Sequence, residues 1–328
     1  MNRMDFVKGV ERLVDPINVG TLHFMQSFNN MIPKKIQKKM VEASGNVTPY
    51  MGFVVEPYSY FLCYEVMDMQ MAESLLPNGF RLIQTKIFES DEPRYYVIFG
   101  CFNAHTSGFW GLRVECYLIA ENVETGLLSW VILDYDTNTI TYDPKIILSD
   151  PNANDSLITT DFNGMLVVDV KNNNERKLVF SSDLKNGLMT ELDQRLWVEG
   201  NLSIAYSKIK SDEVIAPFSL IFDPKEFQKA LRLTKASIKI DANNWFPGLF
   251  KSEPSEMVCF PYAQHFLSDS PGHYSVIMDE KHLVDKIDSI DFMKIAVFST
   301  KAFKKAILTG GILALFTNII LVSLLIMS

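Results

Sequence analysis

The sequence lacks the short motifs that mark the common nucleotide and metal sites. It contains neither a GxxxxGK(S/T) phosphate loop nor a GxGxxG turn after a strand, so a nucleotide site is unsupported. The five histidines have no HExxH or comparable spacing, and the GxSxG turn of a serine hydrolase is missing as well. We therefore expect no metal and no organic cofactor.

Cysteine and positive charge are also scarce. Four cysteines lie within apolar runs and have no CxxC spacing, so we expect buried, reduced thiols: Cys63, Cys101, Cys116 and Cys259. The formal net charge is −8 at pH 7. A general nucleic-acid binder needs a basic face for the phosphates, and we therefore expect no nucleic-acid partner.

One long run has no charge at all. Residues 306–328, "AILTGGILALFTNIILVSLLIMS", could cross a hydrocarbon core about 30 Å thick as a helix. The positive-inside rule predicts a single-pass C-terminal anchor with the soluble domain facing the cytoplasm. That rule rests on three lysines just before the run: Lys301, Lys304 and Lys305. A lipid bilayer is thus an expected partner. The small residues Gly310 and Gly311 would also allow self-association into a homo-oligomer, and the alternative is a plain anchor.

Residues 1–50 predict an amphipathic helical segment. Phe6, Val10 and Val14 stand near helical spacing. A basic cluster follows them: Lys34, Lys35, Lys38 and Lys39. This cluster could contact anionic lipid, and the alternative is a solvated helix face.

Residues 51–300 predict one β-rich domain. Runs such as "RYYVIFGCFNAH" and "GLLSWVILDYD" are rich in Val, Ile, Tyr and Phe, and turns containing Gly, Asn or Asp divide them. The pattern indicates a mainly β, largely antiparallel sandwich or barrel. Short helices are expected in "MQMAESLL", "NGLMTELDQRL" and "DPKEFQKALRL", the last with Asp223 as its cap.

The stretch "TYDPKIILS" carries the first candidate for chemistry, Lys145. An amine attacks a carbonyl only when it is neutral, and burial among apolar side chains lowers the pKa of a lysine toward that state. Glu115, in the strand "GFWGLRVECYLIA", could then move protons or orient a substrate. The alternative is a lysine exposed to water in an ordinary hairpin turn.

Four further residues are candidates for ligand binding. Arg113 shares a strand face with Glu115 and could hold a carboxylate, whereas an exposed cross-strand salt bridge is the alternative. Phe109 and Trp110 could line a ligand cavity, or could belong to the core. Tyr142 lies three residues before Lys145 and completes the set.

The order and spacing of these motifs resemble the acetoacetate decarboxylase-like superfamily. The similar segments run from "AESLLPNGFRLI" through "GFWGLRVECYLIA" and "SWVILDYDTNTITYDPKIIL" to "NDSLITTDFNGMLVVDV". The resemblance implies a closed, cone-like antiparallel β-barrel around an apolar cavity. It also implies that Lys145 stands at the Schiff-base lysine and Glu115 at the active-site glutamate of the family.

The sequence departs from the family's signature around the lysine. Tyr142 replaces a glycine, Asp143 an aromatic residue and Ile146 a second lysine, while an expected arginine–glutamate pair is read as Asn138 and Thr139. These changes favour a membrane-anchored domain that binds a small apolar or lipid-like ligand without the family's decarboxylase activity. The alternative is a Schiff-base lyase that acts on a keto acid or related carbonyl compound through Lys145.

Overall fold

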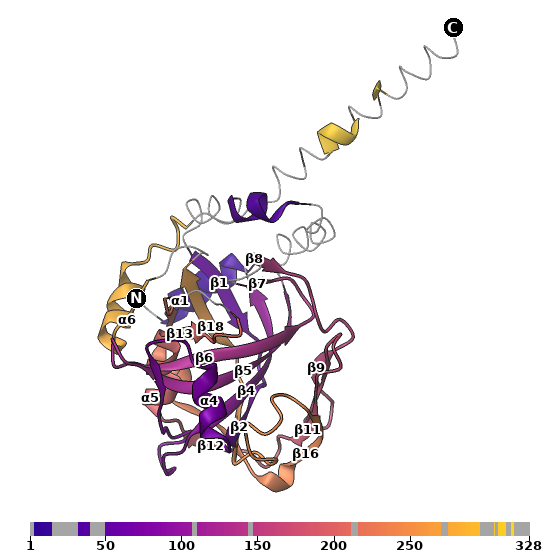
Figure 1. Cartoon of the computed structure of the whole chain (residues 1–328). Helices are drawn as coiled ribbons and strands as arrows, with labels where there is room; N and C mark the ends of the chain where they lie inside the picture. The colour runs from indigo at the N-terminus through magenta and orange to yellow at the C-terminus, as the bar shows by residue number, and fades with distance from the viewer. Residues whose placement is uncertain are drawn as a thin grey trace.

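A computed structural model describes residues 3–14, 32–39, 50–106, 110–143, 147–210, 216–269, 275–295, 305, 308–312 and 316–317. These residues are mainly β, with antiparallel sheets and few, short helices, as the sequence predicts (Figure 1). The strands are β1 (Tyr50–Val55), β2 (Ser59–Glu65), β3 (Phe80–Leu82), β4 (Tyr96–Thr106), β5 (Trp110–Asn122), β6 (Leu128–Thr137), β7 (Thr141–Asp143), β8 (Ile147–Ser149), β9 (Leu157–Thr160), β10 (Met165–Lys171), β11 (Lys177–Asp183), β12 (Leu188–Glu191), β13 (Ile204–Tyr206), β14 (Leu220–Phe222), β15 (Lys229–Leu233), β16 (Ile238–Asn243), β17 (Glu256–Phe260) and β18 (Gln264–Asp269).

The main sheet has 12 strands and is organised around the long strands β4, β5 and β6. One edge of β4 pairs with β2 along its first half and with β1 at its end, while the other edge pairs with β5. From β4 the sheet continues through β2, β17 and β15 to β12, and through β1 and β18 to β14. Its ladders are antiparallel except for the parallel pairing of β13 with β6.

The closed barrel that the resemblance implies is not found. The described strand ladders leave the main sheet open, with β12 and β14 at the ends of its longest path. Between β13 and the chain that enters β14 there is an isolated bridge, Ile204–Phe218, in place of a ladder. A barrel closes only when strand pairing continues around the ring, and strands as short as β13 and β14 provide little edge for pairing.

Two apolar cores cover the two faces of the main sheet. The first core includes Tyr117, Trp130 and Phe266 together with residues of the N-terminal helix. The second core lies between the other face and a four-stranded sheet in the order β16-β11-β10-β9, which Figure 1 shows beside the main sheet. A buried hydrogen bond between the hydroxyls of Tyr60 and Ser182, 2.9 Å long, joins the two sheets.

The helices are short. Besides helical residues at 34–39, 305, 308–312 and 316–317, the described helices are α1 (Arg3–Leu13), α4 (Met69–Leu75), α5 (Gln194–Trp197) and α6 (Glu280–Ser289), with 3-10 turns η2 (Glu199–Leu202), η3 (Pro224–Phe227) and η4 (Lys235–Ser237). In α1 the predicted apolar face is buried, and α4 begins after its cap Asp68. Asp223 caps only a 3-10 turn, because the following "KALRL" pairs with β17 as β15. Likewise, the predicted helix in "NGLMTELDQRL" is divided: Leu188–Glu191 form β12, because they pair with β15, and only the last three residues are helical, as the start of α5.

The four cysteines are free and buried, as predicted. Burial raises the pKa of each thiol, because it disfavours the charged thiolate. These thiols are therefore held in the unreactive form that packs as a small apolar side chain.

In the described part of the chain, no helix is both long and apolar enough to cross a bilayer. Of the predicted span 306–328, this part includes only 308–312 and 316–317, so most of that prediction lies outside the described residues. The basic cluster of residues 34–39 is helical, and its four lysines are exposed.

Candidate functional site

The stretch "TYDPKIILS" forms a hairpin in its described part. Thr141 pairs with Ser149 and Asp143 with Ile147, so β7 and β8 run antiparallel on either side of Lys145. Lys145 itself lies outside the described residues, as do Phe109 and the side chain of Tyr142.

Strand β5 places the candidate polar residues on one face. Side chains alternate along a strand, so Arg113, Glu115 and Tyr117 project from the same side of β5. Tyr117 belongs to the first core, which identifies this side as the one that faces the first core. In the register with β6, Glu115 stands opposite Tyr135.

Arg113 and Glu115 form a buried ion pair. Nε of Arg113 donates to one carboxylate oxygen, and the side chains are only 16% and 10% exposed. The exposed cross-strand salt bridge considered for Arg113 is therefore wrong: the pair is buried and lies along one strand. Burial alone would lower the pKa of Arg113, but the charge and hydrogen bond of Glu115, together with the nearby Tyr135 and Tyr206, outweigh burial, so the net shift is upward.

Three neighbours complete this cluster. The Tyr117 hydroxyl donates to the second oxygen of Glu115, and Nη1 of Arg113 donates to the Thr141 hydroxyl. The Arg113 guanidinium also lies 4.1 Å from the centre of the Tyr135 ring. We call Arg113, Glu115, Tyr117, Tyr135 and Thr141 the Glu115 cluster. Thr141 is the first residue of β7, so the cluster holds the base of the hairpin that carries Lys145.

A second cation approaches the same ring from a distant part of the sequence. The ammonium of Lys210 lies 4.1 Å from the Tyr135 ring centre, and its side chain is 17% exposed. Lys210 pairs with Asp134 over 2.5 Å. The turn that carries Lys210 follows β13 and is tied to β6, because Ser207 donates to the backbone of Ile132 and Leu133.

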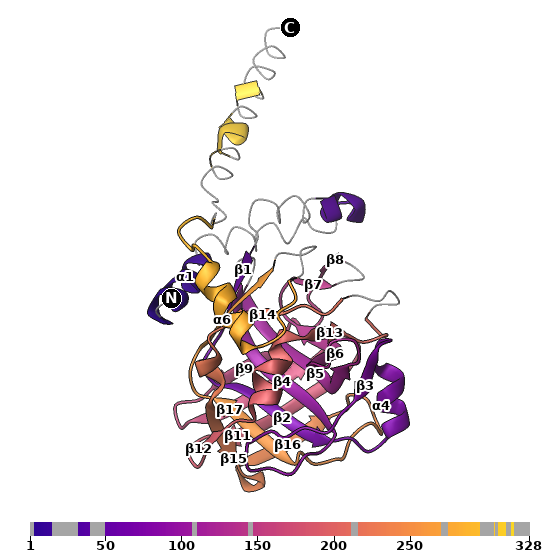
Figure 2. The same cartoon turned by 90° about the vertical axis from the view of Figure 1, so that its left-hand side faces the viewer.

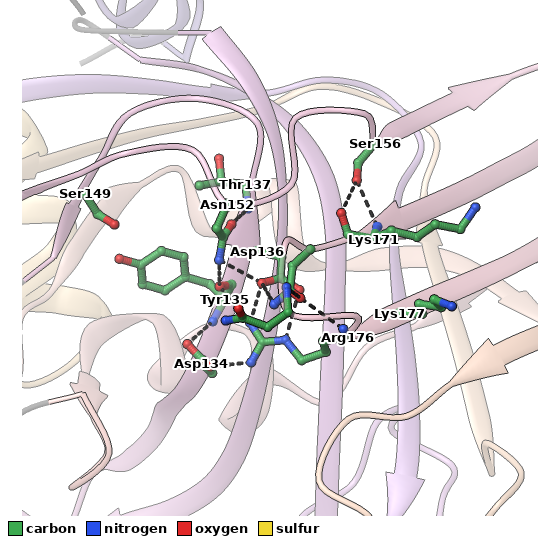
Figure 3. A network of polar contacts seen from close by, with 12 residues as sticks. Asp134, Tyr135, Asp136, Thr137, Ser149, Asn152, Ser156, Lys171, Arg176 and Lys177 are labelled. Atoms are coloured by element: carbon green, nitrogen blue, oxygen red, sulfur yellow. Dashed lines mark hydrogen bonds and ion pairs between the residues drawn. The ribbon is translucent and has the colours of Figure 1, made fainter. Parts of the chain in front are cut away.

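Asp134 also belongs to a network of polar contacts beside the turn between β10 and β11 of the four-stranded sheet (Figure 3). Arg176 donates to Asp134 and to Asp136, and its guanidinium lies 3.8 Å from the ring centre of Trp245. Asp136 is fully buried and also accepts from Asn152 and Asn172. A carboxylate can remain charged there because cation and amide donors surround it.

Trp110, a predicted ligand-binding residue, and Asn138, which stands where the family has part of its arginine–glutamate pair, make other contacts. Trp110 is partly exposed and stacks on His105, whose Nε2 lies 2.6 Å from Glu56. The Asn138 side chain accepts from the backbone N–H of Leu112 over 2.9 Å. It approaches β5 at Gly111, where an added Cβ would lie 2.5 Å from its oxygen. Asn138 is thus a structural residue in this chain.

Sequence reasoning missed four of the residues around this site. Tyr117 and Tyr135 carried a usable signal, since each stands at an alternate position of a strand already assigned. Lys210 and Arg176 carried none, because only the fold brings them to Asp134. Within the described ranges, no group of three or more His, Cys, Asp or Glu side chains is arranged to hold a metal.

Comparisons with known proteins give similarities among solved structures only. No family model and no curated protein matches the chain. An acetoacetate decarboxylase from Legionella pneumophila is 11% identical, with a TM-score of 0.37 over 68% of this chain and 86% of that one. A second acetoacetate decarboxylase structure is 14% identical, with a TM-score of 0.36 over 67% and 86%. The enduracididine biosynthesis enzyme MppR is 11% identical, with a TM-score of 0.33 over 68% and 85%. Two of these three structures are acetoacetate decarboxylases, the family whose motifs the sequence resembles.

Proposed function

We propose that this domain binds a small apolar or lipid-like ligand against the first core, with the polar end of the ligand at the Glu115 cluster. The observation that carries the proposal is the buried Arg113–Glu115 pair on the sheet face that bears the first core. Small-molecule sites combine apolar walls with a few convergent polar groups that fix orientation.

The chemistry of the pair suits binding better than proton transfer. Both oxygens of Glu115 accept hydrogen bonds, one from a guanidinium and one from a phenol. Each oxygen is thus already engaged within the cluster, so Glu115 serves to position the guanidinium of Arg113. A guanidinium has five N–H donors, and Arg113 uses one on Glu115 and one on Thr141, so donors remain for a ligand oxygen.

Schiff-base chemistry at Lys145 is the second candidate, and one contact favours it. The hydrogen bond from Arg113 to Thr141 attaches β7 to the Glu115 cluster, and Lys145 follows Thr141 by four residues. A keto acid bound at Arg113 would then lie near the hairpin that carries the amine. In this alternative, the amine attacks the carbonyl carbon and releases water to form the imine.

Membrane attachment through residues 306–328 belongs to the same proposal. Its support is the uncharged run and the three lysines before it, which would leave the β domain on the cytoplasmic side. A bilayer next to the domain would supply apolar ligands directly. Alkaline carbonate extraction of membranes tests this part: the full chain should stay with the membrane, and release into the supernatant would contradict anchoring.

The binding proposal is tested on the full chain purified in mild detergent. Organic extraction and mass spectrometry should find an apolar compound in stoichiometric amount. The double variant Arg113→Met/Glu115→Met removes both charges at similar volume and should lose the compound, because the polar contact is gone. The matched control is Glu121→Gln on the same strand, whose partner Arg81 is 66% exposed. A wild-type protein without any bound compound, or a double variant that binds as well as the control, would overturn the proposal.

A further inference from the structure

Helix α1 covers part of the first core. Its residues Phe6, Val10 and Leu13, with Val14 just after it, are buried in the apolar cluster that also contains Tyr117 and Tyr135. The helix packs on β1 and β18, and Figures 1 and 2 both place it beside β1. Removing α1 would therefore open an apolar surface that is continuous with the side of β5 carrying Glu115.

Two glycines allow α1 to lie close to β1 and to Phe292. A Cβ added at Gly52 on β1 would lie 2.7 Å from Cβ of Leu13 and 3.2 Å from the carbonyl oxygen of Val10. A Cβ added at Gly9 on α1 would overlap the Phe292 ring. The rings of Phe6 and Phe292 also meet edge to face, 5.8 Å between centres.

A single arginine ties α1 to the segment that precedes the uncharged run. Nη1 of Arg12 donates to the carbonyl oxygen of Phe292 over 3.1 Å, and Nη2 donates to that of Ile295 over 3.3 Å. The position of α1 is thus coupled to residues 292–295.

His265 on β18 contacts α1 through a hydrogen bond that depends on the protonation of its ring. Its Nδ1 lies 3.1 Å from Glu226 of η3, and its Nε2 lies 3.2 Å from Glu11 of α1. Glu226 is only 2% exposed and also accepts from the His265 backbone N–H over 2.8 Å, whereas Glu11 is 53% exposed. Opposite His265 in the β1 register is Val54, which has no charge.

The two contacts require both ring nitrogens of His265 to donate. Only the imidazolium carries two N–H groups, because a neutral imidazole has one donor and one acceptor. When His265 loses one proton, the remaining proton stays on Nδ1, where it bonds to the buried carboxylate of Glu226. If Nδ1 lost its proton instead, its lone pair would face that buried carboxylate. The lone pair of Nε2 then faces the Glu11 carboxylate, and the link to α1 is lost.

We propose that α1 is a pH-sensitive lid over the apolar ligand site, closed by the His265–Glu11 contact and opened when His265 loses its proton. The ligand part of this inference rests on the proposed function, whereas the motion of α1 does not. An apolar ligand enters along the surface that α1 uncovers on β1 and β18. Because Arg12 holds residues 292–295, opening also releases the chain that leads toward the uncharged run.

The direction of the pH effect follows from the environment of His265. Burial lowers its pKa, but the carboxylates of Glu226 and Glu11 outweigh burial, so the net pKa lies above the ordinary value. A raised pKa means that the protonated form stabilises the closed lid at low pH. That stabilisation is lost as the pH rises through the raised pKa.

Hydrogen exchange tests the lid directly. Amides of α1 in the full-length protein should lose protection on the order of tenfold between about pH 6 and about pH 9, after correction for intrinsic exchange, as the loss of one charge-assisted hydrogen bond would give. Amides of the β10–β11 hairpin serve as the internal control. Glu11→Gln should abolish the pH dependence and keep protection high, since its amide can donate to the neutral ring. Glu11→Ala should lower protection at both pH values.

The Glu11 variants separate the lid from the ligand site. At about pH 9, where the wild-type lid is open, Glu11→Gln should bind a dansyl-labelled fatty acid on the order of tenfold more weakly than wild type, because the closed α1 blocks the apolar surface. Glu11→Ala should bind the probe as wild type does at this pH. Equal binding by Glu11→Gln and Glu11→Ala would overturn the lid. A wild-type protein that binds no probe, but whose α1 exchange is pH-dependent, would overturn the ligand site alone. Exchange of α1 that does not change with pH would overturn the switch.

Discussion

Arg113 and Thr141 lie 28 residues apart in the sequence and are joined by a hydrogen bond from guanidinium to hydroxyl. One end of this contact belongs to the buried ion pair of β5, and the other begins the β7–β8 hairpin. The contact therefore couples the polar centre of the first core to the segment in which the sequence places its candidate nucleophile.

Replacing Thr141 by Val should weaken both the hairpin and the ligand site. The substitution keeps the size of the side chain but removes the acceptor of Arg113, which costs about 1–3 kcal/mol for a donor left unsatisfied near the core. Urea denaturation of the full chain in detergent measures the loss. Thr159→Val on the exposed side of β9 is the matched control and should change stability by less than about 0.5 kcal/mol. Equal effects of the two variants would contradict a role for Thr141.

Labelling with a carbonyl compound and borohydride separates the two candidate functions. If Lys145 forms an imine, reduction should add the mass of the compound at Lys145, and Lys145→Ala should abolish both labelling and turnover. If the domain only binds its ligand, Lys145→Ala should leave binding unchanged. Peptide mass mapping reads the outcome, and mass on exposed lysines alone would remove the Schiff-base alternative.

Removing Arg176 should destabilise the domain strongly. Arg176→Met leaves Asp136 buried without its cation, and breaking a buried pair from one side costs about 3–5 kcal/mol. Lys171→Met is the control on the neighbouring strand, because Lys171 pairs with Asp169 at the surface. That exposed pair should contribute at most about 1 kcal/mol. A loss of similar size in both variants would show that the network around Arg176 contributes little.

The stability of the domain should fall in acid partly through Asp134. Burial raises the pKa of this carboxyl, but Arg176 and Lys210 outweigh burial, so its net pKa lies below the ordinary value. A lowered pKa contributes stability that is present above the pKa of the unfolded chain and is lost as the pH falls through the folded value.

Unfolding experiments from about pH 7 to about pH 2 check this contribution. Asp134→Asn should be less stable than wild type at neutral pH, since Lys210 and Arg176 lose a charged partner, and should lose less stability on acidification. The two proteins should therefore become more similar in acid. Parallel curves with a constant offset would show that Asp134 does not titrate with folding.

The sequence by itself determined the local features of this protein. Strand periodicity gave a mainly antiparallel β domain, because alternate apolar side chains define which face of each strand is buried. Helical spacing gave the buried face of α1, and the separation of two residues between Arg113 and Glu115 put them on one strand face. Each of these depends only on neighbours along the chain, where backbone geometry fixes the direction of side chains.

Only the tertiary structure decided what surrounds those residues. The order of the sequence motifs implied a closed barrel. In the described strands the main sheet is open between β13 and β14, because only one isolated bridge joins them. The fold brought Lys210 and Arg176 to Asp134, and Glu11 to His265 across 254 positions of sequence. Such pairs depend on how sheets pack against one another, and a single sequence carries no local signal for the distance between two remote charges. For that reason the shared strand face of Arg113 and Glu115 could be predicted, and strand alternation offered a signal for Tyr135. The second cation, Lys210, and the histidine contact to α1 could not be predicted.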